Sequence, residues 1–482
     1  MKERITGKKV VILGAGHAGL AAAYRAARRG ADVTVLEGKE TVGGLASSFE
    51  INGIRVDFGS HRMNYSLDPE LQADLEQLLG DDLLTRPRNT RIRLRDRWVR
   101  VPLRLSDAFR LPMGFVGGCS FDMIAGATRR FLGRQRNGTH DFRTVMLNDV
   151  GPTLCRDYYF PYHSKVWGLP PEELSLPRVV DHKKENGSLI AKVATTAAIS
   201  KRSGGDRSYY YPKQGYGQIS DSLCKAAQSA GAKFKLGARV TVIDRDDFQT
   251  TGVRYEQEGR EHFIQSDCIW STMPITLLAR CLQPSAPEEV LGASANLTFR
   301  GVLLVYLELA QGRFSDYDTH VVPNPRVSIT RISEPKIQRD SIEPQGRTVI
   351  CLEIPLDPNA SEWDLKDEEL GRLSQEWLGA IGLPIEVPIL SVVTRRLRRV
   401  YPVYKIGTAE SLAIVHRWIE NFEGLLTFGL QGLFAPEDSH HILSMAYSAV
   451  ECLDDQGEFD WERWRDYRKL FERRVAKYLR IR

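Results

Sequence analysis

The residues with the clearest chemical potential form a glycine pattern near the start of the chain. An apolar run at 10–13 leads into G-x-G-x-x-G, made by Gly14, Gly16 and Gly19, and an acid, Glu37, follows 18 positions after the last glycine. The first glycine allows a tight turn out of a strand, the second lets backbone N–H groups approach a pyrophosphate, and the third lets the next helix pack closely. Glu37 is placed to accept hydrogen bonds from ribose hydroxyls. The spacing therefore predicts a pocket for an adenine dinucleotide.

This pocket needs a strand, a helix and a second strand to position it. The alanine-rich stretch from Leu20 to Arg29 predicts the helix, which ends at Gly30. The helix N-terminus would offer unpaired N–H groups and a partial positive charge to phosphates. The apolar run at 33–36 predicts the second strand. A glycine-rich turn in an ordinary α/β domain is the alternative interpretation of the same residues.

The residues that follow Glu37 carry a resemblance to a known group of proteins. With Lys39 and the segment Gly43-Gly44-Leu45, the start of the chain resembles the FAD-binding start of the flavin amine oxidase, protoporphyrinogen oxidase and carotenoid desaturase group. UDP-galactopyranose mutase shares that start. The resemblance implies that Lys39 lies beside the AMP half of FAD and that Gly43 and Gly44 line the pyrophosphate and ribityl chain. It implies further cofactor contacts at Leu45 and Gly59.

Four later segments carry the same resemblance. The first, Tyr211 to Gly217, implies a helix start, and the second, Gly231 to Asp244, implies a strand in which Val240 touches adenine. The third, Trp270 to Pro274, implies a strand end that closes the cofactor domain, and the fourth, Leu425 to Gly429, implies the last strand. The helix from about His440 would aim its N-terminus at the flavin ring and stabilise the reduced form. Gly429 and Ile442 are therefore expected to contact FAD. The cofactor is expected to be held non-covalently, although Cys452 offers a thiol for a covalent link.

Cofactor segments at the start, middle and end of the chain predict two interleaved domains. The expected fold class is α/β, α+β overall, with a Rossmann-like FAD-binding domain and a mixed-sheet plus helical substrate-binding domain. The first would comprise 1–89, 206–285 and 405–482, and the second 90–205 and 286–404. Within the second, residues 301–309 have the pattern of a strand.

The composition favours a soluble, cytoplasmic protein. The seven cysteines among 482 residues are scattered and show no zinc-like spacing, and no run reaches the ~18 apolar residues that a membrane span requires. The first predicted strand begins almost at once, so no signal peptide is expected. No metal site is expected at His440-His441, because no third ligand is spaced nearby, and no motif supports nucleic acid binding.

The net charge of +5 is concentrated in the tail of the chain. Residues 463–482 hold nine basic and two acidic side chains, a balance of +7, so the preceding residues sum to −2. Apolar residues at three- and four-residue spacings predict a basic amphipathic helix at about 460–482. This helix either docks on its own domain or makes peripheral contact with an anionic membrane surface.

Three residues are the candidates for catalysis. His61 follows a G-x-H turn that the resemblance places beneath the flavin, where a histidine can act as a base or bond the flavin edge. A purely structural histidine, held by backbone groups, is the alternative. Trp167, in the segment K-x-W-G, can wall a pocket or belong to an ordinary core. Arg331 is similar to an arginine that related proteins bring to the active site, and a surface ion pair with Glu334 is its alternative.

A second group of residues could bind an anionic substrate. Arg91, Arg93, Arg95 and Arg97 alternate with other residues, which predicts arginines on one strand face, able to hold phosphate or carboxylate. A solvated strand face is the alternative. The residues expected to bind substrate are Arg62, Arg91, Arg93, Tyr211 and Tyr404.

Two functions fit these residues. The first is an FAD-dependent oxidoreductase that moves hydride from a small organic substrate to flavin N5 and passes electrons to oxygen, a quinone or a partner protein, since no second glycine fingerprint for a nicotinamide is present. The second is a non-redox flavoenzyme resembling UDP-galactopyranose mutase. Gly429-Leu430 stands where mutases carry Gly-Arg, which favours the first. A flavin-binding scaffold without activity is a third interpretation.

Overall fold

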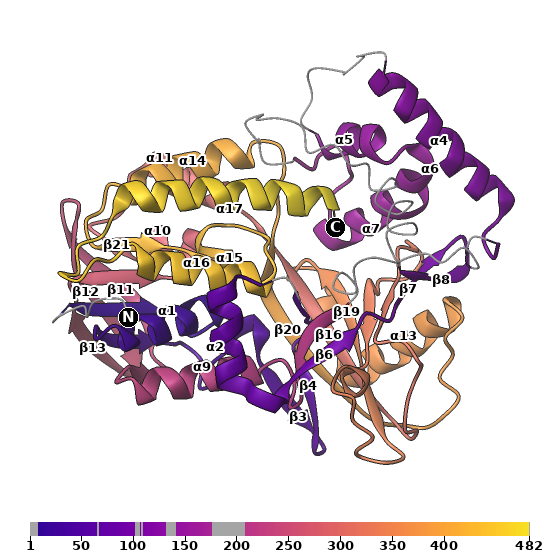
Figure 1. The fold of residues 1–482 in the computed structure, drawn as a ribbon, viewed down its shortest axis with the longest axis horizontal. Coiled ribbons are helices and arrows are strands. Elements are labelled where there is room, and N and C mark those ends of the chain that lie inside the picture. The colour runs from indigo at the N-terminus through magenta and orange to yellow at the C-terminus, as the bar shows by residue number, and fades with distance from the viewer. Residues whose placement is uncertain are drawn as a thin grey trace.

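A computed structural model of the chain describes residues 8–64, 67–101, 107, 109–131, 141–175 and 208–481; the side chains of 129–131 and 474–481 are not described. Residues 176–207, which include the end of the predicted substrate segment 90–205, lie outside the described part. The fold is mixed α/β, with helices and several sheets, as the sequence predicts (Figure 1).

The first sheet is parallel, and its strands come from the start, middle and end of the chain. Its order is β10-β2-β1-β14-β21, with bounds Lys233–Lys235, Asp32–Leu36, Lys9–Leu13, Cys268–Ser271 and Leu425–Thr427. The strands are largely apolar because helices and a second sheet cover them. Helix α1 (His17–Arg28) packs between α9 (Gln218–Ser229) and α16 (Ser439–Glu451), as Figure 1 shows.

A four-stranded sheet adjoins the parallel one and corrects one expectation. Its order is β13-β12-β11-β15, with bounds Arg260–Gln265, Gln249–Gln257, Arg239–Asp246 and Leu282–Gln283. The stretch from Gly231 to Asp244 is not one strand, because it contributes β10 to the parallel sheet and β11 to this one. Gly237, with φ +65°, makes the break between them.

The seven-stranded sheet lies beside these layers. Its order is β20-β16-β19-β18-β17-β7-β8, with bounds Ile389–Pro402, Phe299–Leu309, Thr348–Leu356, Arg331–Ser333, Thr319–Val321, Thr90–Leu94 and Arg97–Val101. The predicted strand at 301–309 is thus the centre of β16. Helix α13 (Asp367–Ala380) packs on β16 and β20.

The prediction of four arginines on one strand face is wrong. Strand β7 ends at Leu94, and Arg95 and Asp96 form the turn to β8 with φ of +48° and +59°. Arg95 pairs instead with Asp157, its Nε lying 2.8 Å from Oδ2. Only Arg91 and Arg93 share a strand.

The remaining strands and helices connect the sheets or lie outside them. The strands are β3 (Ser48–Ile51), β4 (Ile54–Asp57), β5 (Met63–Asn64), β6 (Leu83–Pro87) and β9 (Ser208–Pro212). The helices are α2 (Pro69–Leu79), α4 (Met113–Phe131), α5 (Phe142–Asp149), α6 (Pro152–Leu154), α7 (Phe160–Trp167), α10 (Ile275–Cys281), α11 (Glu288–Asn296), α12 (Pro335–Gln338), α14 (Thr408–Ile419), α15 (Gly429–Gly432) and α17 (Trp461–Ile481).

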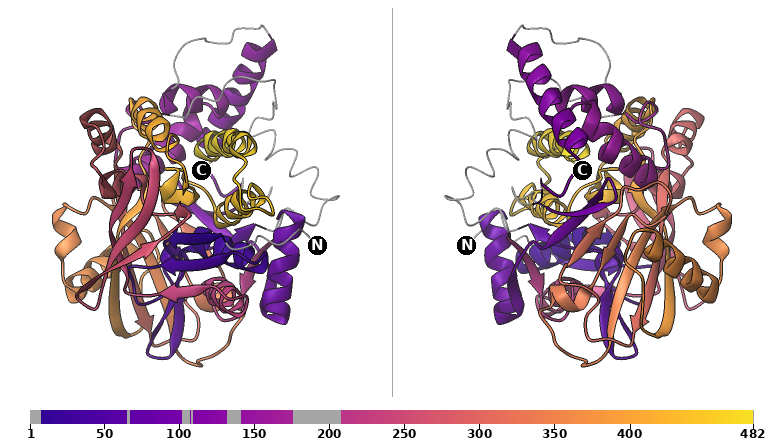
Figure 2. Two further views of the ribbon diagram at one scale, coloured as in Figure 1. Left: turned by 90° about the vertical axis from the view of Figure 1, so that its left-hand side faces the viewer. Right: turned by 90° about the vertical axis from the view of Figure 1, so that its right-hand side faces the viewer.

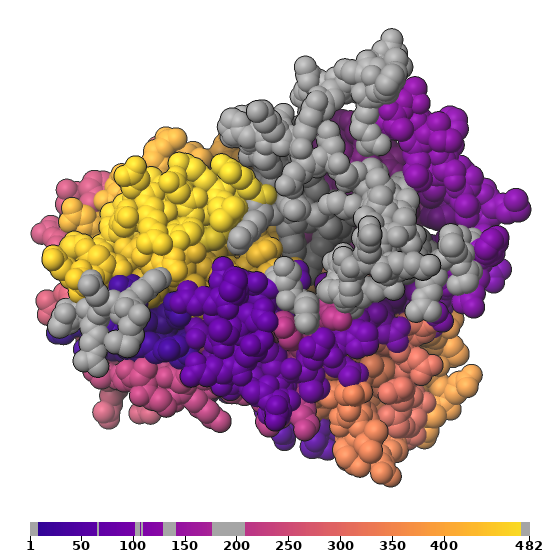
Figure 3. Space-filling view, viewed as in Figure 1, coloured from indigo at the N-terminus to yellow at the C-terminus, as the bar shows by residue number. Residues whose placement is uncertain are grey.

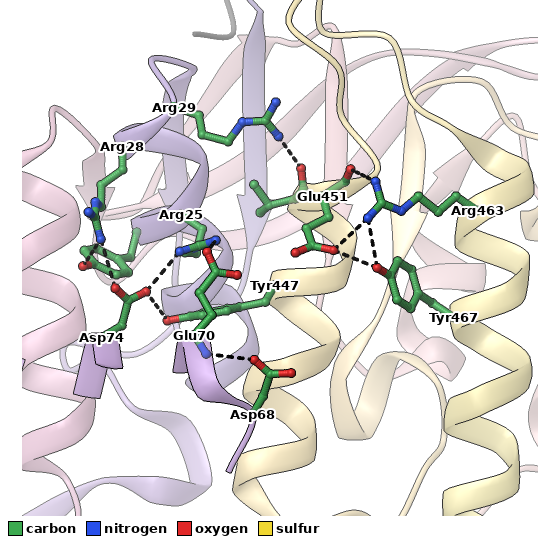
Figure 4. Close-up of polar contacts among 12 residues, drawn as sticks. Arg25, Arg28, Arg29, Asp68, Glu70, Asp74, Tyr447, Glu451, Arg463 and Tyr467 are labelled. Atoms are coloured by element: carbon green, nitrogen blue, oxygen red, sulfur yellow. Dashed lines mark hydrogen bonds and ion pairs between the residues drawn. The ribbon is translucent and has the colours of Figure 1, made fainter. Parts of the chain in front are cut away.

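The C-terminal helix α17 docks on the protein along its described side chains. It lies above α16 in Figures 1 and 2, and Trp464 and Phe471 are buried. The Tyr467 hydroxyl and the Arg463 guanidinium both donate to the Glu451 carboxylate of α16, at 2.7 and 3.0 Å (Figure 4). Residues 461–473 therefore dock on the chain's own domain, which is one of the two predicted roles of the tail.

A buried acid links the cofactor-side helices to one another. Asp74 of α2 accepts hydrogen bonds from Arg25 and Arg28 of α1 and from the Tyr447 hydroxyl of α16, at 3.2, 3.1 and 2.8 Å (Figure 4). Because three helices meet at one carboxylate, the helix that follows the glycine pattern is fixed from two sides.

No described helix is long and apolar enough to cross a membrane.

Candidate active site

The first glycine pattern forms a turn in which two of the three glycines, Gly14 and Gly19, leave no room for a side chain. Gly14 has φ +103°, and its N–H donates to the Leu36 carbonyl at 2.8 Å. A Cβ on Gly19 would lie 1.9 Å from the Gly14 carbonyl oxygen, whereas a Cβ on Gly16 would have no atom of the described residues within 4 Å. Gly14 and Gly19 are therefore required by the protein itself, and Gly16 leaves open space at the N-terminus of α1, where no side chain caps the helix.

The glycine pair Gly43-Gly44 packs directly on the first glycine pattern. The Gly43 N–H donates to the Ala15 carbonyl at 2.7 Å, and a Cβ on Gly44 would lie 3.3 Å from the Gly16 Cα. Gly43 and Gly44 have φ of +102° and +58° and begin the 3₁₀ turn Gly44–Ala46, which contains Leu45. Together, Gly14, Gly16, Gly19, Gly43 and Gly44 form what we call the glycine cradle.

Glu37 closes one end of the glycine cradle. Its Oε2 accepts from the Ala15 N–H at 2.7 Å and its Oε1 from the Lys39 N–H at 2.9 Å. A carboxylate oxygen has two lone pairs, so each retains capacity for a ribose hydroxyl. The Glu37 carbonyl accepts from the Ala238 N–H at 2.8 Å, which brings β11 and its half-buried Val240 to the same end.

Two buried polar groups beside the glycine cradle have no partner within the described protein. His17, the first residue of α1, is 5% exposed, and neither of its ring nitrogens has a hydrogen-bond partner. Burial, with a smaller contribution from His61, lowers the pKa of His17 to about 3, so its imidazole is neutral at pH 7. The Ser220 hydroxyl, also buried and without a partner, lies 3.0 Å from a Cβ built on Gly43. Such orphaned groups fit a polar ligand that completes their hydrogen bonds.

The turn at 57–61 is fixed by a buried acid. The Asp57 carboxylate accepts hydrogen bonds from the Ser48 and Tyr211 hydroxyls and from the Tyr216 N–H, and its carbonyl accepts from the Tyr306 hydroxyl at 2.6 Å. Tyr211, expected to bind substrate, is thus fully buried and engaged within the protein. Its hydroxyl supports the turn.

His61 lies at the end of this turn and stacks on Tyr216. The His61 and Tyr216 ring centroids are 4.9 Å apart and nearly parallel, and the His17 ring is 5.7 Å from the same tyrosine. His61 Nε2 lies 3.0 Å from the Phe58 carbonyl oxygen. Since a carbonyl only accepts, a neutral His61 carries its proton on Nε2 and keeps Nδ1 as an acceptor.

Arg331 reaches the same turn through an acid that the sequence analysis did not select. The Arg331 Nε lies 3.2 Å from Glu353 Oε2, and Glu353 Oε1 accepts from the Ser60 N–H at 2.7 Å. The Arg331 guanidinium also donates to the Tyr401 hydroxyl at 3.4 Å, and the Tyr401 ring is 5.8 Å from that of Trp167. Arg331, Glu353, Tyr401 and Trp167 form what we call the arginine cluster.

The alternative of an ion pair between Arg331 and Glu334 is wrong. Glu334 is buried and accepts from the Phe314 N–H at 3.0 Å and from the Thr348 hydroxyl at 2.7 Å. Side chains alternate across a strand, so Arg331 at the start of β18 and Glu334 beyond its end point to different partners.

Trp167 is held by its neighbours in the segment K-x-W-G. Its indole N–H donates to His163 Nδ1 at 3.1 Å. The Lys165 ammonium donates to the carbonyls of Val322, Asn324 and Ile329, at 2.9, 3.0 and 2.5 Å, which ties α7 to the loop beyond β17. All three ammonium protons are used, so Lys165 fixes the position of Trp167 relative to the seven-stranded sheet.

The other expected substrate residues do not form one site. Arg62 pairs with Asp318 at 2.8 Å, Arg91 lies between the rings of Trp98 and Tyr317, and Arg93 donates to the Ile381 carbonyl. The Tyr404 hydroxyl donates to the Phe434 carbonyl at 2.6 Å. These four residues are engaged within the protein, and only Arg62 adjoins the turn at 57–61.

The end of the chain returns to the glycine cradle as predicted. Gly429 follows β21 with φ +85°, and a Cβ there would lie 2.9 Å from the Ala18 Cβ of α1. Helix α16 starts at Ser439, and Ile442 lies half-buried in its first turn. Cys452, just beyond α16, is 1% exposed, and burial raises the pKa of its thiol to about 12, which disfavours a covalent link.

Two residues of this site, Glu353 and His17, have features in the sequence that mark them as candidates. Glu353 is the lone charge in the apolar stretch 348–356, and His17 occupies a variable position inside G-x-G-x-x-G. A charge inside a buried strand needs a partner, and this could have been read from the sequence. The identity of that partner could not.

Comparison with known proteins agrees with this arrangement. Residues 17–438 match the sequence profile described as flavin containing amine oxidoreductase. The chain is 25% identical over 410 residues to the zeta-carotene-forming phytoene desaturase of Myxococcus xanthus (76% of each chain), and 24% identical over 451 residues to the phytoene dehydrogenase of Streptomyces griseus (78% of this chain, 80% of the relative). The crystal structure of reduced UDP-galactopyranose mutase superposes with a TM-score of 0.74 at 18% identity, covering 93% of this chain and 94% of that one.

The protein is therefore a flavoenzyme with an FAD-type dinucleotide fold. The chain belongs to the flavin containing amine oxidoreductase family, and it is an FAD-dependent oxidoreductase that acts on a small-molecule substrate with an electron acceptor. The superposition on UDP-galactopyranose mutase concerns the fold alone.

Proposed function

We propose that this protein is a dehydrogenase or desaturase that removes a hydride and a proton from a small organic substrate at the junction of the glycine cradle and the arginine cluster. Bound FAD would supply the two-electron acceptor, with N5 receiving the hydride. The observation that carries the proposal is the contact of Glu353 with both the Ser60 N–H and Arg331. It joins the residues expected around the flavin to those expected around the substrate.

The glycine cradle would hold FAD non-covalently. Open space at Gly16 suits the pyrophosphate, Glu37 suits the ribose, and the neutral His17 imidazole and the Ser220 hydroxyl suit polar atoms further along the cofactor. In this proposal the predicted segments 1–89, 206–285 and 405–482 form the cofactor domain.

His61 would take the proton that leaves the substrate. Its Nε2 is occupied by the Phe58 carbonyl, so Nδ1 is the atom that can accept. Arg331 would place a positive charge beside the reacting atoms, and Glu353 would hold its guanidinium in position. Trp167 would form a wall of the substrate site. The substrate's electrons leave to oxygen, a quinone or a partner protein.

The relatives support dehydrogenation of a carbon–carbon bond more than a sugar rearrangement. Of three relatives that match more than three quarters of this chain, two are named as a phytoene desaturase and a phytoene dehydrogenase, and the third as a coproporphyrinogen III oxidase. The alternative is a mutase-like use of reduced flavin on a nucleotide sugar, and UDP-galactopyranose mutase shares the fold of this chain. Leu430 in place of the arginine of mutases weighs against it, because a cation near a diphosphate is missing.

Anaerobic reduction distinguishes the two functions. The holoenzyme is mixed without oxygen with phytoene, a primary amine or UDP-galactopyranose, and the flavin absorbance is followed. The proposal expects bleaching by a substrate of the first two kinds, and no bleaching in the His61→Ala variant with bound FAD. The enzyme could instead convert the sugar nucleotide only after prior chemical reduction and without consuming an oxidant. That result would contradict the proposed dehydrogenation and establish the mutase-like function.

A further inference from the structure

Three basic residues stand in one row across neighbouring strands at the end of the seven-stranded sheet. Arg91 of β7 lies opposite His320 of β17 on one side and opposite Arg100 of β8 on the other. Residues directly opposite on neighbouring strands share a face of the sheet and lie about 5 Å apart. We call Arg91, Arg100 and His320 the basic row. In the view that Figures 1 and 3 share, β7 and β8 lie on the right, whereas α1 lies on the left.

The basic row faces away from the arginine cluster. Arg331 of β18 lies opposite Val321, the residue that follows His320 in β17. Because successive side chains of a strand point to opposite faces, Arg331 lies on one face of the sheet and the basic row on the other. The basic row is thus separate from the proposed catalytic site.

Two aromatic rings hold the Arg91 guanidinium between them. Its Cζ lies 4.7 Å from the centroid of the Trp98 ring and 4.6 Å from that of the Tyr317 ring. A cation–π contact occupies the flat faces of a guanidinium and leaves the N–H groups in its plane able to donate. The buried Arg91 Nε has no hydrogen-bond partner, and Arg91 forms no ion pair, among the residues that the structure describes.

The other two members of the basic row also have unused polar atoms. Arg100 Nε donates to the Tyr317 hydroxyl at 3.3 Å, and no described acid pairs with its guanidinium. His320 is 1% exposed, and its Nε2 lies 3.2 Å from the Ser315 hydroxyl oxygen. Its Nδ1 makes no hydrogen bond of normal geometry within the described part of the chain.

The basic row lacks compensating negative charge. Like charges directly opposite one another destabilise a pair of strands, and Arg91 and Arg100 stand in that relation. Burial lowers the pKa of Arg91, and burial followed by the charge of Arg91 lowers the pKa of His320. The acids that influence the two arginines, Asp316 and Asp107, form their ion pairs with other arginines. A bound anion would offset all of these costs.

We propose that the basic row binds a phosphate group, as inorganic phosphate or a phosphate monoester, at a site separate from the cofactor and the substrate. A phosphate dianion has enough oxygens to accept hydrogen bonds from Arg91, Arg100 and His320 together. Hydrogen bonds between charged partners are about twice as strong as neutral ones. The Trp98 and Tyr317 rings fix the Arg91 guanidinium before the ligand arrives, which reduces the entropic cost of binding.

Isothermal titration calorimetry of the holoenzyme at about pH 7.5 tests this proposal, with FAD filling the glycine cradle. Inorganic phosphate, glycerol 3-phosphate and acetate are titrated separately at one ionic strength. We expect one saturable site per chain for the two phosphates. Acetate should bind at least about tenfold more weakly, because it carries one charge and two oxygens. The tighter of the two phosphates shows whether the free anion or an ester is the ligand.

The variant Arg91→Met removes the central cation and should lower the affinity for phosphate at least about tenfold. The matched control is Arg97→Met. It removes an exposed arginine of the same strand pair that points to the opposite face, and it should bind phosphate like the wild type. Arg100→Met changes the less buried arginine of the row and should also weaken binding.

A second readout is the melting temperature of the holoenzyme. Phosphate should raise it in the wild type and in Arg97→Met, and not in Arg91→Met. If Arg91→Met loses its flavin absorbance and so fails to fold, Arg100→Met replaces it in the comparison with Arg97→Met. The proposal is overturned by absence of saturable phosphate binding in the wild type, by equal affinities in the row variant and the control, or by acetate binding as tightly as phosphate.

Discussion

The glycine cradle and the arginine cluster are built in different ways. The glycine cradle is made by backbone atoms, and its residues come from two short stretches, 14–19 and 43–44. The arginine cluster is made by side chains from four separate elements, α7, β18, β19 and β20. The cradle therefore depends on the absence of side chains, and the cluster on the pairing of buried charges. The two should respond differently to substitution.

The largest effect is expected inside the glycine cradle. Gly19→Ala forces a Cβ to within 1.9 Å of a backbone oxygen, so strand β1 and helix α1 must separate. We expect a loss of about 4 kcal/mol or more in the free energy of unfolding of the apoprotein, measured by urea denaturation. Gly16→Ala is the matched control, because its Cβ would contact none of the residues that the structure describes.

Gly16→Ala should separate binding from stability. The apoprotein is expected to unfold at the wild-type urea concentration, while its affinity for FAD, measured by quenching of flavin fluorescence, falls by at least about tenfold as the methyl group meets the pyrophosphate. Equal stability losses in the two variants would show that Gly16 serves only the fold.

In the arginine cluster, Glu353→Gln removes one partner of a buried ion pair. We expect about 3 kcal/mol of destabilisation and a drop in kcat, because Arg331 loses its fixed position. Glu334→Gln is the control: it changes another buried acid of the same region that does not contact Arg331. It should affect stability with kcat retained. If both variants lower kcat alike, Glu353 has no specific role in positioning.

A smaller effect is expected where the cradle offers a side chain to FAD. His17→Leu preserves bulk but removes the unpartnered ring nitrogens, so the affinity of the apoprotein for FAD should fall about tenfold, the worth of one buried hydrogen bond. The matched control is His320→Leu. It changes a comparably buried histidine of the seven-stranded sheet, whose Nε2 contacts Ser315. Unchanged FAD affinity in His17→Leu would remove this residue from the cofactor site.

The smallest predicted effect is a change in the free energy of unfolding with pH. Burial, and then Arg91, lower the pKa of His320 to about 3, whereas in the unfolded chain it is about 6.5. Below about pH 6.5 the unfolded state binds a proton that the folded state does not, so stability falls as the pH falls. Between pH 7.5 and 6 this histidine should cost about 0.8 kcal/mol. Urea unfolding at both values should show a weaker pH dependence in His320→Leu, and an equal dependence would assign the effect to other groups.

The contrast between the two regions explains what the sequence could predict. The turn at 14–19, the helix after it and the strand at 301–309 follow from local patterns of glycine and apolar residues. The helix near His440 was implied by the family resemblance, and the structure contains all four elements. Two predictions made from the sequence were wrong. Gly237 divides a stretch expected to be one strand, and Arg95 and Asp96 adopt the left-handed region without being glycine.

Long-range pairs lay beyond the sequence. Arg62 binds Asp318, which is 256 residues away, and Ser60 binds Glu353 at a separation of 293. Nothing in one sequence states which distant acid an arginine will meet, so arginines expected to hold substrate were found in structural ion pairs and cation–π contacts. The roles of His61, Trp167 and Arg331 remain predictions that their positions now make testable.

The two-electron midpoint potential of bound FAD in Arg331→Gln tests the central claim most directly, namely that the arginine cluster faces the cofactor held by the glycine cradle. Removing a nearby cation destabilises the reduced flavin anion, so the potential should fall by about 30 mV or more, which is about 1.4 kcal/mol. A potential equal to that of the wild type, in a variant that retains its FAD, would contradict the account.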